Sequence, residues 1–254
     1  FPERIENLMG IEGGDLLKLL NKVAFIIPQN NANNALNGML FEIGNEKLSM
    51  VATDGYSLAR VETATYTLPE QHSWLIPKRA VMEIRKLTES NPSATIFIGA
   101  CGNQLVFSGE HFNFFTKLIA DQFPQYAPVL NKEGFAPARL TREPFLKTLK
   151  RTGCLLSGQF VGAKFSFCPG TMTVQLHNKE VGKLEEKIAL SDYAAEPFET
   201  YFYSPYLLNG LQALTEDTVS FFIKNGSTPI IFESLSASYN FTYLVMPVAT
   251  ARAS

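Results

Sequence analysis

The chain has few of the residues and patterns by which most enzymes and membrane proteins are recognised. Its 254 residues include three cysteines, three histidines and one tryptophan. No apolar run approaches the roughly 18 residues that a membrane-spanning helix needs. The Walker phosphate loop and the GxGxxG, HExxH and GxSxG motifs are missing as well. These absences argue against a membrane protein, a common type of nucleotide-binding enzyme, a zinc protease and a serine hydrolase.

The cysteines and histidines that are present do not form a metal site or a redox pair. Cys101, Cys154 and Cys168 are odd in number and far apart, and no histidine lies at ligand spacing from another histidine or a cysteine. We therefore expect no metal, no cofactor and a reducing, cytoplasmic location. The chain also begins without a methionine or a signal-peptide pattern, so we expect it to be cut from a longer protein.

What the sequence does contain is a repeat at a spacing of about 125 residues. Three pairs of segments align in the same order: 16–22 with 145–151, 76–89 with 203–216, and 113–119 with 240–245. Such ordered matches predict that one fold is used twice. We expect residues 1–8 to be the end of a preceding linker, followed by one domain over 9–127 and a second over 128–254.

Each half divides again into two similar pieces, in which a helix is followed by strands. Apolar spacing predicts helices over 15–24, 77–88, 142–153 and 205–214. Strand-like runs between turn residues predict strands over 39–43, 48–53, 57–62, 95–98, 104–108, 112–118, 163–168, 172–177, 219–224, 229–233 and 240–246. The Pro- and Gly-rich segment 121–136 reads as the linker. This pattern favours an α+β fold with two helices and about eight strands in each domain.

Positive charge is concentrated on the predicted helices. Together these carry +7, so the rest of the chain carries −9 to reach the net charge of −2. Any amphipathic helix has a solvated charged face, but charge gathered on equivalent helices of a repeat is more specific. Side by side, these faces would attract phosphates without reading bases, with an affinity that falls as salt rises. The cations are Lys18, Lys22, Lys78, Arg79, Arg85, Lys86, Arg142, Lys147, Lys150 and Arg151.

One carboxylate, Asp54 between Thr53 and Gly55, invites a catalytic interpretation, but a turn residue at a strand end explains it more simply. We find no group of residues that requires catalytic chemistry. An enzyme with a duplicated α+β domain stays open as an alternative, and a carboxylate or histidine with a strongly perturbed pKa in a pocket would favour it.

Five segments carry a family likeness: LNGMLFE at 36–42, VATDGYSLA at 51–59, IPKR at 76–79, FPQY at 123–126 and YLVMPV at 243–248. In this order, over essentially the whole chain, they resemble the bacterial DNA polymerase III β subunit, a sliding clamp. The Ala-Thr-Asp-Gly and Met-Pro signatures are specific in combination. Phe1-Pro2 resembles the end of the family's first domain, so we expect only the second and third domains here.

The resemblance implies the DNA-clamp fold in two tandem copies and a processivity factor without catalytic activity. In this family two chains join into a ring around duplex DNA, and helices line the hole. It therefore implies that the ten helical cations contact phosphate without sequence preference. The implied partners are duplex DNA, the catalytic subunit of DNA polymerase III, the clamp loader and repair polymerases, together with self-association into a ring and no membrane.

The resemblance also implies a hydrophobic groove between the second and third domains that receives short linear motifs of partner proteins. Apolar, aromatic and Met side chains suit a peptide's Leu or Phe anchors. By position, the groove would be lined by Leu36, Thr53, Gly55, Tyr56, Leu58, Pro124, Val129, Phe160, Tyr203, Tyr206, Leu244, Met246, Pro247 and Val248. Core packing is the alternative for any one of them. Cys154 and Leu155 match apolar positions of the ring contact.

Several positions depart from the family pattern and leave the motif preference open. Tyr56-Ser57 stands where the family often has His-Arg, Pro128 replaces a basic residue, and Tyr203 replaces a polar one. Six residues follow Met-Pro-Val, where many relatives stop sooner. Two chains of two domains cannot make the family's usual six-domain ring, although three chains could, so a clamp-fold adaptor that binds partner peptides without encircling DNA is the second hypothesis. A monomer in light scattering would favour an adaptor or a fragment, and a trimer would favour a closed ring.

Overall fold

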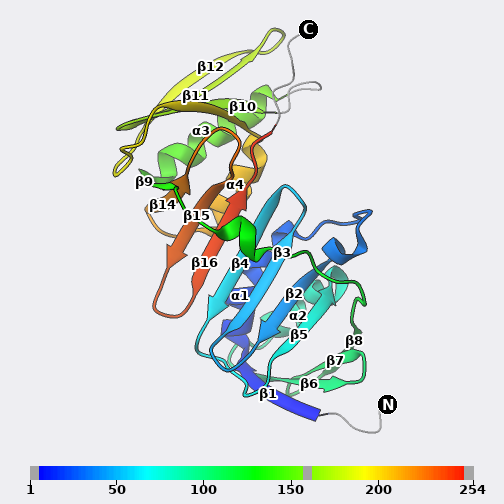
Figure 1. Cartoon of the computed structure of the whole chain (residues 1–254). Coiled ribbons are helices and arrows are strands. Elements are labelled where there is room, and N and C mark those ends of the chain that lie inside the picture. Colours follow the sequence, from blue (N-terminus) through cyan, green and yellow to red (C-terminus); the bar gives the residue numbers. More distant parts are fainter. Residues whose placement is uncertain (1–5, 157–161, 249–254) are drawn as a thin grey trace. The chain divides into compact units, whose positions relative to one another are not determined.

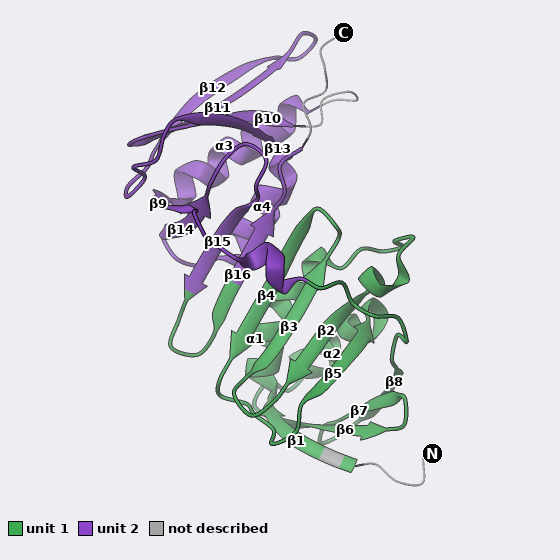
Figure 2. Ribbon diagram, in the orientation of Figure 1, with its two compact units in different colours: residues 1–125, 235–241 green, residues 126–234, 242–254 purple. Residues whose placement is uncertain are grey.

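The computed structural model describes residues 6–156 and 162–248 (Figure 1). It divides into two compact units, which Figure 2 distinguishes by colour. Unit 1 comprises residues 1–125 and 235–241, and unit 2 comprises residues 126–234 and 242–254. The division therefore falls two residues before the boundary expected from the sequence. It also gives a short segment near the end of the chain to the first unit.

Unit 1 consists of two helices and two antiparallel sheets. The strand order is β5-β2-β3-β4 in one sheet and β1-β6-β7-β8 in the other. Its elements are β1 (Glu6–Glu12), α1 (Gly13–Val23), β2 (Gly38–Ile43), β3 (Leu48–Thr53), β4 (Ser57–Thr63), β5 (His72–Pro77), α2 (Lys78–Glu89), β6 (Thr95–Cys101), β7 (Gln104–Ser108) and β8 (Asn113–Lys117), with single 3-10 turns η1 (Ala24–Ile26) and η2 (Asn34–Asn37).

The helices of unit 1 pack against each other and bury their apolar stripes on the sheets. Helix α1 contacts β3 and β4, and α2 contacts β2 and β5. Leu16, Leu20 and Val23 of α1 are nearly inaccessible to solvent, as are Val81 and Ile84 of α2. This i, i+3, i+4 spacing is the one from which the sequence predicted both helices. Lys18 on α1 and Lys86 on α2 are exposed, whereas Lys22 of α1 is buried.

Unit 2 repeats this plan, with strand orders β12-β11-β10-β13 and β16-β15-β14-β9. Its elements are η3 (Ala127–Leu130), β9 (Ala136–Thr141), α3 (Arg142–Leu155), β10 (Ala163–Cys168), β11 (Thr171–Asn178), β12 (Gly182–Ala189), β13 (Phe198–Phe202), α4 (Ser204–Ala213), β14 (Thr218–Ile223), β15 (Ile230–Leu235) and β16 (Asn240–Val245). The core is aromatic: the Phe165 ring meets those of Phe145 and Phe202 edge-on, with centroids 6.5 and 5.4 Å apart.

Each unit contains the same motif twice: one strand, one helix, then three strands. The leading strand joins the opposite sheet, since β1 pairs with β6 while β5 pairs with β2. In unit 2, β9 likewise pairs with β14, and β10 pairs with β13. The expected α+β class, with two helices on antiparallel sheets and a twofold internal repeat, is confirmed.

The sequence missed the strands that lead each motif, namely β1, β5, β9 and β13, and also β12. The buried strand β5 shows no alternation, and β12, Gly-Lys-Leu-Glu-Glu-Lys-Ile-Ala, is too polar to read as a strand. Gly153 was expected to end α3, but the helix continues to Leu155, and Gly153 does not adopt a positive φ. Across residues 6–156 and 162–248, no helix has the length and apolarity to cross a membrane.

Candidate functional site

The first turn of α2 places two cations where the helix dipole disfavours them. Lys78 is half-buried and Arg79 is exposed, and the N-cap residue Pro77 provides no capping side chain. By contrast, α1 and α3 carry Asp15 and Glu143 in their first turns. No carboxylate of the described residues lies within ion-pair distance of either α2 cation. The positive end of the helix and two uncompensated charges together favour an anion at this point.

Three other lysines form exposed ion pairs along their own helices. The Lys18 Nζ lies 3.4 Å from Asp15, the Lys86 Nζ 3.6 Å from Glu83, and the Lys147 Nζ 3.4 Å from Glu143. Pairs of this exposure contribute only about 0–1 kcal/mol, so a phosphate can compete for these lysines.

Arg151 is held by a carboxylate of a neighbouring strand. Its Nε lies 2.5 Å and its Nη2 2.6 Å from the two carboxylate oxygens of Glu186 on β12, and Thr148 donates a further hydrogen bond of 2.5 Å. The hydrogen bonds from Arg151 hold the pKa of Glu186 below its usual value of 4.5, although burial acts against them. The same contact raises the pKa of Arg151. Arg151 is therefore a bidentate partner of Glu186 rather than an open cation.

Three more of the expected phosphate-contacting residues are buried or half-buried. Lys22 is 7% exposed, and its Nζ lies over the rings of Tyr239 and Phe241, so it faces the interior instead of the solvent. Arg142 donates from Nε to the Leu211 carbonyl 3.0 Å away, which joins α3 to α4. Arg85 is half-buried. The sequence count had treated all of these charges as equivalent, and for Lys22 the expectation of a solvent-facing charge is wrong.

In unit 1 the expected groove residues surround a rigid turn between β3 and β4. The Asp54 Oδ1 accepts from the backbone amides of Tyr56 and Ser57 at 2.9 and 2.7 Å, and Thr53 Oγ1 donates to the Ser57 carbonyl at 2.6 Å. These contacts account for Asp54 as a turn residue. Gly55 has a φ of +92°, which favours glycine. The turn leaves the Tyr56 side chain largely exposed.

The remaining groove positions of unit 1 differ in accessibility. Leu36 is buried, and a side chain at Gly55 would approach its Cδ1 to 4.0 Å, so Leu36 lies beneath the turn. Leu58 is 4% exposed and belongs to the core. Pro124 is exposed. Thus the side chains of Tyr56 and Pro124 are accessible to a partner, whereas those of Leu36 and Leu58 are buried.

In unit 2 the expected groove positions include a pair of tyrosines and the segment after β16. The Tyr203 and Tyr206 rings meet edge-on, with centroids 5.0 Å apart, and the Tyr243 hydroxyl donates to the Tyr206 carbonyl at 2.8 Å. Met246, Pro247 and Val248 are half-buried, and the Val248 amide donates to the Tyr201 carbonyl at 2.8 Å. Leu244 is core, Val129 is exposed on η3, and Phe160 lies outside the described residues.

The two expected ring-contact residues lie at the end of α3. Cys154 is exposed and Leu155 is half-buried. They line an open hollow of about 390 Å³ together with Arg151 and residues 183–186 of β12. Strand β12 stands at the end of its sheet in the strand order. The sequence did not identify Glu186 as part of this site, since nothing in the local pattern of a charged strand indicates the helix that it pairs with.

Within the described ranges, no group of three or more His, Cys, Asp or Glu side chains could hold a metal ion. Within the same ranges Glu199 also has a shifted pKa, because the hydrogen bond from the Lys164 ammonium lowers it. Both carboxylates are thus stabilised in the charged form by cations. Neither has the raised pKa that would favour a general acid.

Two family models match the chain in succession. The central domain of the DNA polymerase III beta subunit matches residues 10–125, and the C-terminal domain of the same subunit matches residues 129–249. The beta sliding clamp of Pseudomonas putida is 27% identical over 240 residues, covering 94% of this chain and 64% of the relative. That of Chlamydia pneumoniae is 29% identical over 236 residues, covering 92% and 62%. The chain therefore spans less than two thirds of these relatives.

Solved structures agree in fold. The sliding clamp of Pseudomonas aeruginosa has a TM-score of 0.89 at 24% identity, covering 98% of this chain and 68% of the other. The clamp of Bartonella birtlesii bound to griselimycin has a TM-score of 0.88 at 25% identity, with the same coverage. The order of the two domain models, the repeated motif and this common fold lead to one conclusion. The chain belongs to the DNA polymerase III beta subunit family and contains that family's central and C-terminal domains.

Proposed function

We propose that this chain acts as part of a DNA sliding clamp, a non-catalytic processivity factor that holds duplex DNA without sequence preference and tethers replication and repair proteins in the cytoplasm. The observation that carries the proposal is the succession of both domain models over residues 10–125 and 129–249. The first turn of α2 adds support from the structure, because its cations occupy the position at which a phosphate is stabilised.

The DNA-binding part is tested by fluorescence anisotropy with two short duplexes of unrelated sequence, each titrated over about 25–200 mM NaCl. We expect equal affinities for the two duplexes and a linear loss of log affinity with log salt. A marked preference for one sequence, or binding that salt does not weaken, would contradict a clamp.

For partner recognition we propose two surfaces, one at Tyr56 and Pro124 and the other at Tyr203, Tyr206 and Met246. The exposed ring of Tyr56 and the half-buried rings of Tyr203 and Tyr206 are suitable contacts for the Leu and Phe side chains of a short linear motif. The partners would be the polymerase III catalytic subunit, the clamp loader and repair polymerases.

Titration calorimetry with a peptide carrying Gln followed by Leu and Phe anchors tests this. We expect a Kd in the micromolar range, at least about tenfold weaker binding after Tyr206→Ala, and no change after Tyr201→Ala as a nearby tyrosine control. Absence of heat with wild-type protein would remove the peptide-binding proposal and leave the DNA-binding proposal standing.

We also propose that the hollow at Cys154 and Leu155 contacts another subunit in a complete ring. An edge strand beside an open, partly apolar hollow is suited to continuing a sheet across an interface. Sedimentation of a chain that includes the preceding domain is expected to show a dimer that Leu155→Asp dissociates, whereas Val181→Asp in the nearby exposed turn leaves it intact.

A further inference from the structure

Residues 235–241 depart from the division of the chain into successive domains. They form the tip of the β15–β16 hairpin, and the chain on either side of them belongs to unit 2. The tip itself belongs to unit 1, as the colours of Figure 2 show. Unit 1 is therefore completed by seven residues that arrive more than a hundred positions after its last preceding residue, Gln125. Side chains elsewhere in unit 1 therefore have to contact this segment.

The first contact is a buried lysine. Lys22 in the last turn of α1 is 7% exposed, and its Nζ lies 5.2 Å from the ring centroid of Tyr239 and 5.3 Å from that of Phe241. Phe241 is fully buried. A cation over aromatic rings is attracted more strongly when water is excluded, as it is here. Burying an ammonium without compensation would be costly, and the two rings of the tip contribute to that compensation.

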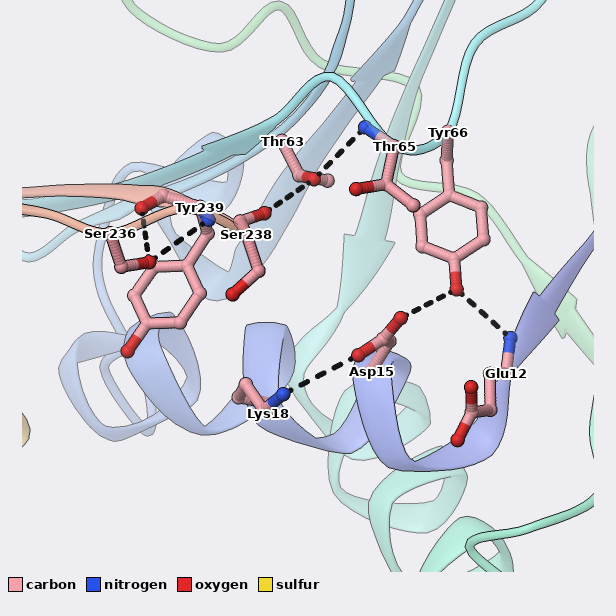
Figure 3. A network of polar contacts seen from close by, with 9 residues as sticks. All are labelled: Glu12, Asp15, Lys18, Thr63, Thr65, Tyr66, Ser236, Ser238 and Tyr239. Carbon is pink, nitrogen blue, oxygen red and sulfur yellow. Dashed lines mark hydrogen bonds and ion pairs between the residues drawn. The ribbon is translucent and has the colours of Figure 1, made fainter.

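The second contact is a hydrogen bond from β4. Thr63 is 5% exposed, and its Oγ1 donates to the Ser238 carbonyl at 2.8 Å (Figure 3). The tip is also ordered internally. The Ser236 amide and hydroxyl donate to the Tyr239 carbonyl at 3.0 and 2.8 Å, and the Tyr239 amide donates back to the Ser236 hydroxyl at 3.1 Å. A preformed turn loses little conformational entropy when it is held.

The other end of α1 is anchored independently of the tip. The Tyr66 hydroxyl donates to Asp15 at 2.7 Å and accepts from the Glu12 amide at 3.3 Å, while Lys18 pairs with Asp15 (Figure 3). Burial, with the hydrogen bond to Asp15, raises the pKa of Tyr66 to about 12, so this group stays a neutral donor at physiological pH. Lys18 thus shares the helix with Lys22 but is exposed and pairs with Asp15.

We propose that residues 235–241 are a clip, anchored by Lys22 and Thr63, that completes unit 1 with a segment from near the end of the chain. Because of the clip, the conformation of the hairpin tip depends on contacts with α1. The clip also assigns Lys22 a structural role, distinct from the phosphate-contacting role that its position in the sequence suggested. The inference does not depend on DNA or peptide binding.

Hydrogen exchange of the full chain, followed by mass spectrometry, tests the clip. Lys22→Met keeps the length and apolar stem of the side chain but removes the charge. We expect the amides of 235–241 to exchange roughly tenfold faster, the factor that corresponds to a desolvated cation–π contact, with β10 to β13 unchanged. Lys18→Met is the matched control and is expected to leave the tip as in the wild type. Equal exchange of the tip in wild type and Lys22→Met would overturn the proposal.

A second pair of variants keeps the test decisive if Lys22→Met prevents unit 1 from folding. Thr63→Val is nearly isosteric and removes the hydroxyl that donates to the Ser238 carbonyl and accepts from the Thr65 amide. Tyr239→Leu leaves Thr63 intact and removes one of the two rings. Each is expected to accelerate exchange of the tip several-fold without affecting β10 to β13. If both leave the tip protected as in wild type, the clip is not held by these contacts and the proposal fails.

Discussion

Helices α2 and α3 look alike in the sequence and differ in the structure. Over the expected bounds 77–88 and 142–153, each carries a net charge of +3. In α2 the cations Lys78 and Arg79 stand in the first turn without an acidic residue beside them. In α3 the first turn has Glu143, which pairs with Lys147, and Arg151 is bound by Glu186 from outside the helix. The two helices therefore have the same formal charge but differ in how far their cations are already paired with carboxylates.

The difference shows where the chain departs from local stability rules. Cations in a first turn oppose the helix dipole and lower helix stability by a few tenths of a kcal/mol or more. Such departures are expected at functional positions, where a ligand compensates for them. Helix α3 also has a cation in its first turn, but this Arg142 donates to the Leu211 carbonyl, and Lys147 and Arg151 pair with carboxylates that stabilise the free protein. We infer that α2 contributes more to phosphate binding than α3 does.

The largest expected effect follows from removing the two first-turn cations. Lys78→Ala with Arg79→Ala should weaken duplex binding by about tenfold or more and reduce the slope of log affinity against log salt by about 2, since each lost phosphate contact contributes about 0.9. The same variant should be as stable as wild type or slightly more stable in thermal unfolding, because an unfavourable dipole interaction is removed. Anisotropy over a salt series measures the first effect.

The matched control is Lys147→Ala with Arg151→Ala, which removes the same charge from α3. We expect a slope change well below that of the α2 variant, together with a lower melting temperature. Equal slope changes in the two double variants would show that the ion pairs of α3 do not withhold its cations from DNA, and the comparison would then fail.

A smaller effect of opposite sign is expected at Glu186. Glu186→Gln removes the negative charge that holds Arg151, so Arg151 becomes an open cation. We expect duplex affinity to rise about two- to threefold, while unfolding in urea occurs at lower concentration by an amount equivalent to about 1 kcal/mol. Glu185→Gln, on the same strand, is the control for a general change in charge and should raise affinity less. Unchanged affinity in both variants would indicate that α3 lies away from bound DNA.

The sequence could predict the helices and the repeat, because both depend on local spacing. Leu16, Leu20 and Val23 mark one face of α1 without any knowledge of its partners, and the core confirms that face. It also predicted the Asp54 turn, whose contacts are all within three residues. The family likeness then supplied the order of the domains, which the two matched models confirm.

What the sequence could not predict are the contacts between distant positions. Lys22 occupies a position next to the apolar stripe of α1, and the local pattern does not indicate that its ammonium lies over the rings of Tyr239 and Phe241. Glu186 lies 35 positions from Arg151 on a strand that was not predicted. The charge of a helix can be counted from the sequence. Whether its cations can bind an external anion depends on their pairing with residues that are distant in the sequence.

The smallest effect concerns pH and tests whether the Glu186 contact stabilises unit 2. The folded state holds the pKa of Glu186 below its unfolded value, so the contact stabilises fully above the ordinary glutamate pKa and is lost as pH falls through the lowered value. Wild type should therefore exceed Glu186→Gln in stability by about 1 kcal/mol near pH 7, and this gap should close as pH falls below the ordinary glutamate pKa and through the lowered one. Urea unfolding followed by circular dichroism measures the gap, and the remaining carboxylates cancel because both proteins contain them. A gap that stays constant over this range would mean that the bidentate contact with Arg151 contributes nothing through its charge, and α3 would then have to be regarded as carrying the same available charge as α2.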